Sequence, residues 1–455
     1  IYFDYFKDEG MEETLSIYGH WDEKKQTYTR AVRPGELIKN PNQANVLKEI
    51  KKYGAEGFYK GWVRDAMLEA IDGANTLCED DFTYFLEHGA FYSDPLHTTY
   101  TATSDGKTYD VYSTGCESSG GAIMLEMLNE VEQYASHNNI NLKELGYDNP
   151  DYIHLVSSAM QYAYADRRAY VADTSINPVT GEPFNVLPIN GIINKAYAYK
   201  RFTNVFDPDS VCLYASNRDY GEMIGANPWD YDPTVVRTSL DTNAPNQDSV
   251  GTTSFSVVDK DGNMCCLTFT NSSFWGAYIM PEGTGFMLNN SVTNFNWTAG
   301  INQFQPYKHA AVYLSPSLAL LDGMPFASFG APGSEKIPVV QAQVFLNMVE
   351  HGMDVDTAVQ KGRVFSYRVT AEDNESMEFP ETENYFNKKL LSVETYDYKE
   401  ETLNALREKG YSIHAYTEPG IAAVQALRVN YDANGRKVNY EGTGDARRGG
   451  KALAY

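Results

Sequence analysis

The chain has 455 residues, and its 37 Lys and Arg against 61 Asp and Glu give a net charge of −24 at pH 7. A hydrophobic content of 42% and an aromatic content of 13% are typical of a globular protein with a sizeable core, not of a disordered chain. Because so acidic a chain is repelled by phosphate backbones and anionic lipids, we expect neither nucleic acid nor an anionic membrane surface as a partner. No apolar run is long enough to span a bilayer.

The first half of the chain predicts irregular segments that alternate with helices. Residues 1–35 show little periodicity and are expected to be irregular. A helix is predicted from Asn40 to Gly54, because Asn is a good N-cap and the following Pro suits the first helical position. Further along we expect a helix over 62–71, a loop and two strands over 80–117, a helix opened by Ser118 to Gly121, a helix over 151–164, and a surface linker over 207–250. The Ser/Gly turn at 118–121 could bind an anion through its N–H groups, or could only cap its helix.

The second half predicts mainly strands. Two runs of alternating and β-branched residues flank Asp261-Gly262, a strong hairpin signal. We then expect short strands to about residue 295, strands over 312–321 and 325–329, a long helix from 338, a helix over 399–409 and a hairpin at 434–435.

Metal chemistry has no support in the residue pattern. The eight histidines show no His-Glu-x-x-His or similar spacing, and the five cysteines are widely spread. We therefore expect no metal and no cofactor. The cysteines are interpreted as core packing, with the adjacent Cys265 and Cys266 on opposite faces of a strand.

The first strand of the 252–270 hairpin carries hydroxyl side chains at its leading end, directly after Gly251. Cutting the peptide bond before Thr252 would place a free α-amine beside the Thr252 hydroxyl. An α-amine titrates near roughly 7.7–8.0, so a useful fraction is neutral at physiological pH. One residue would then supply both nucleophile and base. From spacing alone, a plain Thr-rich hairpin is the favoured explanation, because Thr is an ordinary strand residue.

Several motifs in order give the chain a family resemblance. Thr252 to Asn263, Thr268 to Thr270, Gly285 to Asn290, Ser315 to Ser317 and Gly330 to Ser334 resemble successive segments of the small subunit of gamma-glutamyltranspeptidases. These are N-terminal-nucleophile hydrolases made as one chain that cuts itself in front of a Thr. The resemblance covers most of residues 35–455.

The resemblance implies an α+β fold, the four-layer αββα sandwich of N-terminal-nucleophile hydrolases. Residues 1–251 would be the C-terminal part of the large subunit and 252–455 the small subunit, both in one αββα domain and associated after cleavage. The chain would start well inside the large subunit, so the family's carboxylate-binding Arg would precede it. An extracellular or cell-envelope location is also implied.

The resemblance carries roles onto individual residues. Thr252 would be the nucleophile, in a cleavage site formed with Gly251, and Thr270 would hydrogen-bond it. The N–H groups of Gly333 and Ser334 would form an oxyanion hole, although the family usually has two glycines there. Asn271, or Ser272 with a different gap, would bind substrate.

Two departures bear on the substrate. The family has an aspartate that pairs with the substrate's α-ammonium, and Asn294 falls at that position, with no acidic residue over 289–308. Val312 and Tyr313 replace the family's pair of serines. A substrate with an acylated amine would not need the aspartate, which favours internal units of poly-gamma-glutamate or other N-acyl amides. Candidates for a basic patch that would bind such a polyanion are Lys308, His309 and Lys336.

The sequence therefore predicts a self-processing enzyme that transfers or hydrolyses gamma-glutamyl or related amides through an acyl-Thr252 intermediate. Its partners would be a small-molecule amide substrate, with water or an amine as acceptor. A poly-gamma-glutamate depolymerase or N-acyl amide acylase is the alternative. A homologue that is never processed and only binds is the alternative from another class.

Overall fold

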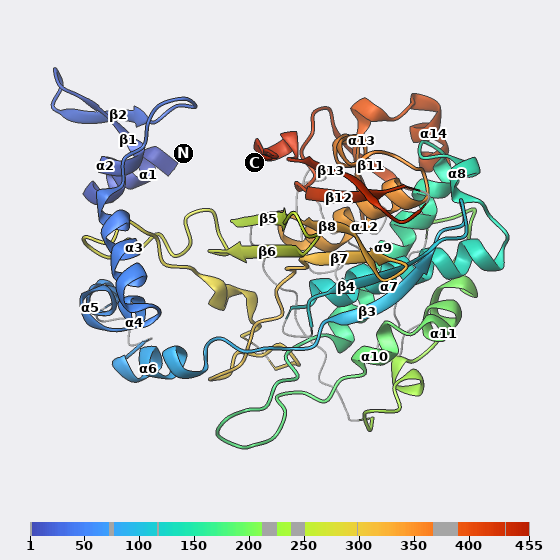
Figure 1. Ribbon diagram of the computed structural model, residues 1–455, viewed down its shortest axis with the longest axis horizontal. Helices are drawn as coiled ribbons and strands as arrows, with labels where there is room; N and C mark the ends of the chain where they lie inside the picture. The colour runs from blue at the N-terminus through green and yellow to red at the C-terminus, as the bar shows by residue number, and fades with distance from the viewer. Residues whose placement is uncertain are drawn as a thin grey trace. The chain divides into compact units, whose positions relative to one another are not determined.

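The computed structural model describes residues 2–71, 77–115, 118–211, 225–237, 251–297, 299–366, 390–432 and 434–454. Contacts divide the chain into two compact units (Figure 1). Unit 1 comprises residues 1–93 and 271–290, and unit 2 comprises residues 94–270 and 291–455.

Unit 1 is mainly helical. Its elements are α1 (Tyr2–Asp8), α2 (Glu12–Tyr18), β1 (Gly19–Asp22), β2 (Thr27–Ala31), α3 (Pro41–Tyr53), α4 (Glu56–Tyr59), α5 (Gly61–Ala70) and α6 (Glu79–His88). The predicted helices over 40–54 and 62–71 are confirmed as α3 and α5. Asn40 caps α3 as expected, since its side chain accepts from the Gln43 N–H at 3.0 Å.

The expectation that residues 1–35 are irregular is wrong, because two helices and a hairpin form there. The rings of Phe6 and Tyr18 each lie 4.9 Å from the ring of Trp275, in edge-on contact. These aromatic contacts join segments about 270 residues apart in the chain. The sequence pattern within residues 1–35 does not include the distant aromatic partner, so periodicity alone could not predict α1 and α2.

A second correction concerns residues 79–88, which form the helix α6 where a loop was expected. The backbone N–H of Cys78 donates to the Asp81 carboxylate at 2.7 Å, closing half of a capping box. Acidic side chains fill the first turn of α6, where the helix dipole favours them. Because Cys is an unusual N-cap residue, the sequence carries no ordinary N-cap signal that would predict the start of this helix.

A third correction concerns the segment 271–290, which is a loop and not a series of short strands. Its backbone turns at glycines with positive φ, including Gly283 and Gly285. The Glu13 carboxylate accepts from the N–H groups of both glycines, at 2.8 and 2.9 Å. The Asn40 amide donates to the Gly285 carbonyl at 2.7 Å. Contacts with α2 and α3 therefore hold this loop.

Unit 2 holds the remaining elements. Its helices are α7 (Gly120–His137), α8 (Leu142–Leu145), α9 (Pro150–Tyr170), α10 (Ile189–Ile192), α11 (Lys195–Ala198), α12 (Ile337–Val349), α13 (Val355–Gln360) and α14 (Glu400–Glu408). Its strands are β3 (Leu96–Thr101), β4 (Thr108–Ser113), β5 (Thr252–Val258), β6 (Met264–Thr270), β7 (Ser317–Leu321), β8 (Met324–Gly330), β9 (Val364–Phe365), β10 (Leu390–Glu394), β11 (Ser412–Tyr416), β12 (Gln425–Tyr431) and β13 (Lys437–Thr443).

An antiparallel six-stranded sheet, in the order β13-β12-β8-β7-β4-β3, forms the centre of unit 2. The helices α7 and α12 pack on this sheet, and α9 packs on α7, as the helices behind the strands in Figure 1 show. All thirteen residues of α12 are buried. Its polar side chains are hydrogen-bonded, as when the Gln341 amide donates to Ser315 Oγ at 2.9 Å. Helices and sheets together make this an α+β fold.

The predicted linker over 207–250 is only partly described, and one described part is integral to unit 2. Residues 228–231 form a 3-10 turn in which Trp229 is buried. The Asp232 carboxylate accepts from the Asn190 N–H at the start of α10, at 3.0 Å. The expectation of a surface linker is therefore wrong for this part. Residues 212–224 and 238–250 lie outside the described residues.

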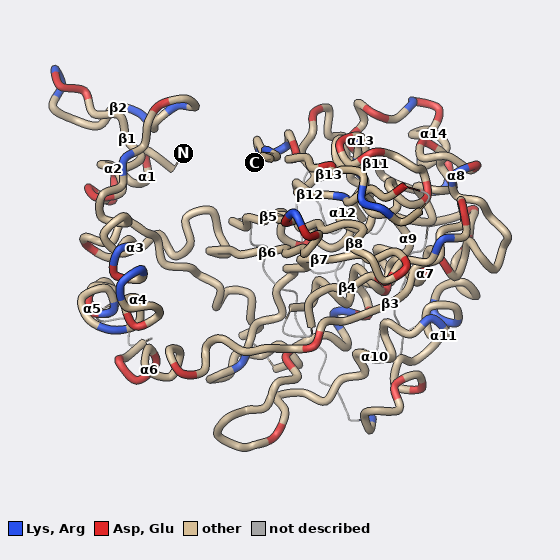
Figure 2. Tube along the Cα trace, in the orientation of Figure 1, with Lys and Arg blue, Asp and Glu red and all other residues tan. Residues whose placement is uncertain are grey.

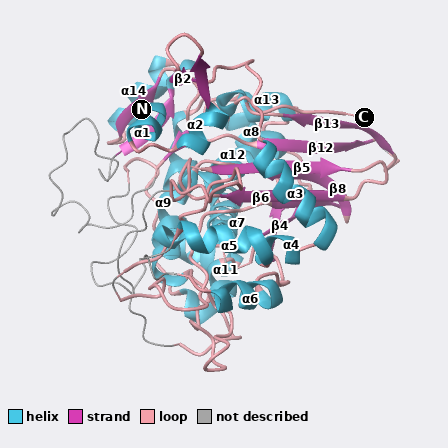
Figure 3. Ribbon diagram, turned by 90° about the vertical axis from the view of Figure 1, so that its left-hand side faces the viewer, coloured by secondary structure: helices cyan, strands magenta, loops and turns pink. Residues whose placement is uncertain are grey.

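The β5–β6 hairpin lies beside β8 and β12, as Figure 3 shows. The residues that face the six-stranded sheet are small and polar. Ser328 Oγ on β8 donates to Ser256 Oγ at 3.0 Å, and Ser254 Oγ lies 3.1 Å from Thr268 Oγ1. A Cβ added at Gly330 would lie 2.1 Å from Ser254 Oγ, so the two layers approach closely at a position that only glycine can occupy.

The opposite face of this hairpin is apolar and exposed. Its large apolar side chains are 43–50% exposed: Phe255, Val257, Leu267 and Phe269. The two adjacent cysteines lie on opposite faces as expected, but only Cys266 is partly enclosed. Cys265 and Cys78 are exposed, so their assignment to the core is wrong.

Two surface properties complete the description. Acidic and basic residues are interspersed along the chain and not gathered on one element (Figure 2). In the described part of the chain, no helix combines the length and the apolar character needed to cross a bilayer.

Two carboxyl groups lie within the core of unit 2. Glu126 and Glu130 are fully buried on α7, and no N–H or hydroxyl donor to either carboxyl group occurs among the described residues. Burial, followed by the negative charges of Asp166 and Glu130, raises the pKa of Glu126 well above its ordinary value. Burial also raises the pKa of Glu130, and the Arg201 charge only partly opposes it. Both shifts favour the protonated, neutral form of these side chains in the folded protein.

This pair predicts a loss of stability with rising pH. Both carboxyls ionise near pH 4.3 in the unfolded chain but keep their protons when folded, so the unfolded state binds fewer protons above that pH. The free energy of unfolding should fall by up to about 1.4 kcal/mol per pH unit for each carboxyl, until the pH reaches the folded pKa. Urea unfolding of the Glu126→Gln/Glu130→Gln double variant should show a flatter pH profile. The exposed Glu401→Gln on α14 is the control, and a profile unchanged in the double variant would contradict the assignment.

The close approach at Gly330 gives a second prediction. In Gly330→Ala, the new Cβ would meet Ser254 Oγ at 2.1 Å and Cys266 Sγ at 2.9 Å. Overpacking of this kind costs about 1–3 kcal/mol of unfolding free energy. The matched control is Gly442→Ala on β13, where the nearest atom would lie at 3.7 Å. Chemical denaturation compares the two variants, and equal stability would show that the layers are not in close contact.

Candidate active site

Thr252 is the first residue of β5 and pairs directly with Thr270, the last residue of β6. Its Oγ1 donates a hydrogen bond to Thr270 Oγ1 at 3.1 Å, and Thr252 is only 7% exposed. The tight turn at 259–263 fixes this register, because the Asp259 carboxylate accepts from the N–H groups of Asp261 and Asn263, both at 2.9 Å. The hairpin expected from the sequence is thus confirmed. The two hydroxyls meet at its open end.

The strand β8 leads toward the same end of the hairpin. Ser328 contacts Ser256, and Gly330 two residues later faces Ser254, so β8 runs opposite in direction to β5. Ala331 and Pro332 continue the chain from Gly330 into the turn at Gly333.

The turn after β8 contains the two proposed oxyanion donors. Gly333 has φ +146° and Ser334 has φ +58°, a left-handed value that is uncommon for a residue with a side chain. No acceptor for the Gly333 N–H is found among the residues that the structure describes. The Tyr164 hydroxyl donates to the Glu335 carbonyl and so anchors the turn to α9. Ser334 thus takes a backbone conformation that would suit the glycine expected from the resemblance.

The proposed substrate-binding asparagines differ in setting. Asn271 directly follows Thr270, is exposed, and belongs to unit 1, where its carbonyl accepts from the Asn290 N–H at 3.1 Å. Asn294 belongs to unit 2 and is buried in a 3-10 turn (Ser291–Asn294). Its side-chain amide donates to the Ser291 carbonyl at 3.0 Å, and its backbone carbonyl accepts from the Asn302 side-chain amide at 2.8 Å.

The three candidates for a basic patch are engaged within the protein. Lys308 Nζ donates to the Ile301 carbonyl at 2.7 Å, and burial lowers the pKa of this lysine. His309 Nδ1 lies 3.1 Å from Asp173, and Lys336 pairs with the adjacent Glu335. Burial alone would raise the pKa of Asp173, but hydrogen bonds led by those from His309 lower it to about 2. The side chains at these positions therefore do not form an open cationic surface.

The Ser/Gly turn before α7 is hydrogen-bonded to the backbone of the segment that precedes β7. The N–H and Oγ of Ser119 both donate to the Val312 carbonyl, at 2.7 and 2.8 Å, and Ser118 Oγ donates to the same atom at 3.2 Å. A Cβ at Gly120 would lie 2.2 Å from the Tyr313 carbonyl oxygen. The turn thus holds the segment that leads into β7. The prediction of an anion site is wrong for Ser119, because its N–H is already bonded to the Val312 carbonyl. The Ser119 side chain does not cap α7 either.

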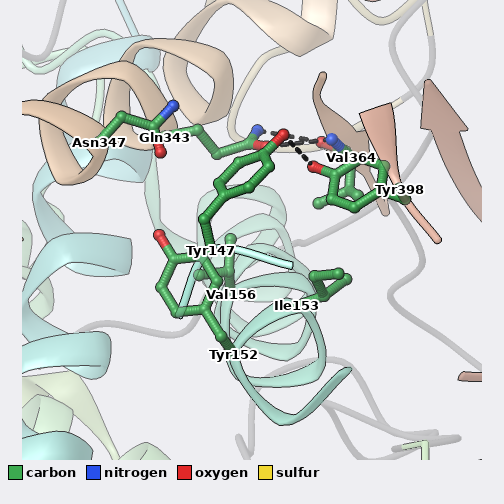
Figure 4. A pocket seen from close by; sticks show the side chains of 8 residues that line it. All are labelled: Tyr147, Tyr152, Ile153, Val156, Gln343, Asn347, Val364 and Tyr398. Atoms are coloured by element: carbon green, nitrogen blue, oxygen red, sulfur yellow. Dashed lines mark hydrogen bonds between the residues drawn. The ribbon is translucent and has the colours of Figure 1, made fainter. Parts of the chain in front are cut away.

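A small cavity of unit 2 lies apart from these residues. Figure 4 shows its lining, from α9, α12, β9 and the loops that precede α9 and α14: Tyr147, Tyr152, Ile153, Val156, Gln343, Asn347, Val364 and Tyr398. The Tyr147 hydroxyl donates to Tyr398 at 2.8 Å across it. Since none of the predicted site residues lines this cavity, we assign it to packing.

Sequence reasoning missed a set of buried charges in unit 2: Arg363, Glu394, Asp445 and Arg447. All four side chains are at most 2% exposed. The family resemblance extends over most of these positions but assigns no role to their charges. The signal that could have found them is the Asp445-Ala446-Arg447 spacing, which puts opposite charges within one turn.

The sequence profile of the family described as gamma-glutamyltranspeptidase matches residues 10–455. The glutathione hydrolase proenzyme of Pseudomonas sp. (strain A14) is 26% identical over 343 residues, which cover 73% of this chain and 52% of that protein. The acylase ACY 1 proenzyme of Pseudomonas sp. (strain SE83) is 26% identical over 340 residues, covering 74% and 52%. This chain thus spans about half the length of the curated relatives it matches.

The fold is also found among solved structures. The cephalosporin acylase from Bacillus halodurans superposes with a TM-score of 0.68 at 20% identity, covering 94% of this chain and 64% of that one. At this identity the likeness concerns the fold. With a profile match over nearly its whole length, the chain belongs to the gamma-glutamyltranspeptidase family.

Proposed function

We propose that this chain is the catalytic part of a self-processing enzyme that transfers or hydrolyses gamma-glutamyl or related amides through an acyl-Thr252 intermediate. The observation that carries the proposal is the 3.1 Å hydrogen bond between Thr252 and Thr270 at the leading end of β5, directly after Gly251. The names of two relatives, both proenzymes, support processing.

In the proposed maturation, Thr252 Oγ1 attacks the Gly251 carbonyl carbon. The peptide C–N bond breaks, and an ester joins Gly251 to Oγ1. Water then hydrolyses the ester and leaves Thr252 with a free α-amine, which is the base that its own hydroxyl needs. The hydrogen bond to Thr270 orients the hydroxyl before either reaction.

The mature enzyme repeats this chemistry on a substrate amide. Thr252 Oγ1 attacks the amide carbonyl, and its proton passes through the α-amine to the departing amine. The N–H groups of Gly333 and Ser334 stabilise the developing oxyanion. Water or an amine then takes the acyl group from Thr252.

The two halves would stay together after cleavage. The strand β4 precedes the proposed cut and β7 follows it, yet they pair in one sheet from Tyr109 with Leu321 to Tyr112 with Leu318. Residues on both sides of the cut also share the core. We therefore propose that 1–251 and 252–455 remain associated as subunits.

An N-acyl amide acylase is the second candidate function. Asn294 replaces the aspartate that would pair with a free α-ammonium, and its amide is bonded to the Ser291 carbonyl. An acylase is among the relatives, at the same identity as the glutathione hydrolase. Because Lys308 and His309 are engaged internally, a small N-acyl amide fits better than a polyanion.

Thr252→Ala in the full-length protein tests the nucleophile. Release of nitroaniline from gamma-glutamyl nitroanilide should fall by at least about a thousandfold, because loss of a nucleophile removes most of the rate enhancement. Thr252→Ser keeps a hydroxyl and should retain part of the activity. Full activity in Thr252→Ala would overturn the proposal.

The same assay with the N-acetylated nitroanilide separates the two substrate classes. A faster reaction of the N-acetylated compound would favour the acylase. Preference for the free amine would favour the transpeptidase.

A further inference from the structure

The segment 271–290, here called the 271–290 loop, leaves unit 2 directly after Thr270 and returns to it after Asn290. Its two ends are joined by hydrogen bonds. The Asn290 N–H donates to the Asn271 carbonyl at 3.1 Å, and the Asn290 side-chain amide donates to Ser273 Oγ at 2.9 Å. The Ser273 N–H donates to Asn290 Oδ1 at 2.9 Å. The base of the loop is therefore closed at the residue that follows Thr270.

The two arms of the 271–290 loop are also hydrogen-bonded to each other beyond this base. The Ala277 N–H donates to the Leu288 carbonyl at 2.8 Å, and the Leu288 N–H donates to the Ile279 carbonyl at 2.9 Å. A Cβ at Gly276 would lie 1.9 Å from the Leu288 carbonyl oxygen, so the arms are in close contact. Because closely packed arms move together, a displacement of the tip is transmitted to the base.

Glu13 of α2 holds the tip of the loop with both of its carboxylate oxygens. Oε2 accepts from the Gly283 N–H at 2.8 Å, and Oε1 accepts from the Gly285 N–H at 2.9 Å. The Asn42 amide also donates to Oε1, at 2.9 Å, and so orients the carboxylate. Hydrogen bonds to an ionised carboxylate are of the stronger kind, so this contact fixes the tip on α2.

The backbone two residues after Thr270 has a conformation that needs such support. Ser272 has φ +72° and is fully buried. This left-handed value is unfavourable for a residue with a side chain and persists only where the surrounding structure enforces it. The hydrogen bonds of Asn290 flank Ser272 on both sides, at Asn271 and at Ser273. The closed loop therefore enforces the conformation of Ser272.

We propose that Glu13 is a positioning residue of the active site, which holds Asn271 and Ser272 in their substrate-binding conformation through the 271–290 loop. This inference rests on the proposed function and takes one of these two residues to bind the substrate. Glu13 precedes the proposed cut and the loop follows it, so the contact also links the two proposed subunits. A substrate contact made equally in the ground state and the transition state lowers KM and leaves kcat unchanged.

Glu13→Gln and Glu13→Asp in the full-length enzyme test the proposal. Gln keeps the size of the side chain but places an amide nitrogen against one of the two glycine N–H groups. Asp keeps the negative charge in the first turn of α2, but its side chain is one methylene shorter. Each variant should raise the KM for the nitroanilide that the wild type uses at least about fivefold, with kcat within about twofold.

Glu12→Gln is the matched control, because Glu12 is the exposed neighbour of Glu13 in the same first turn of α2. It removes the same charge and leaves the contacts of Glu13 in place, so its KM should equal that of the wild type. Hydrogen exchange followed by mass spectrometry reports the loop itself. Amide exchange over 271–290 should be faster in both Glu13 variants and unchanged in the control.

The outcomes separate this inference from the proposed function, with all variants assayed at a temperature at which they are folded. Faster exchange over 271–290 with a wild-type KM in both Glu13 variants would overturn the positioning role. Unchanged exchange, an equal rise of KM in Glu12→Gln, or a fall of kcat without a rise of KM would overturn it as well. In each case an inactive Thr252→Ala leaves the proposed function standing, whereas an active Thr252→Ala would overturn the proposed function itself.

Discussion

The antiparallel register of β5 and β6 is the constraint on which the proposed chemistry depends. A side-chain period of two places Thr252, Ser254 and Ser256 on the face that meets the six-stranded sheet. A slip of one residue would turn Thr252 to the outer face and separate it from Thr270. The turn at Asp259 sets this register at one end of the hairpin. At the other end, the same register brings the hydroxyls of Thr252 and Thr270 into hydrogen-bond contact.

The second constraint is the close contact between the hairpin and β8. Because Gly330 has no side chain, the end of β8 can lie against Ser254 of β5, just before the turn at Gly333 and Ser334. Residues 420–424 lie against this turn, since the Ala423 N–H donates to the Pro332 carbonyl at 3.2 Å. Segments from the middle and the end of the chain thus converge on one short turn.

Much of this arrangement was accessible from sequence where the signal is local. The Asn40 cap, the hairpin around Asp261-Gly262 and the helix after Pro338 all follow from short-range rules, and ordered motifs indicated the fold class. The misses share a cause. Helices α1 and α2 pack on a segment about 270 residues away, and Arg363 meets its partner Asp445 across 82 residues, so no local pattern reports them.

The most direct test of the account is the intact mass of the full-length protein, as wild type and as Thr252→Ala. The account predicts two fragments divided between Gly251 and Thr252 in the wild type, and a single uncut chain in the variant, because the Thr252 hydroxyl performs the cut. An uncut chain in both proteins would contradict self-processing and favour the homologue that only binds. A cut in both would remove the nucleophile role from Thr252.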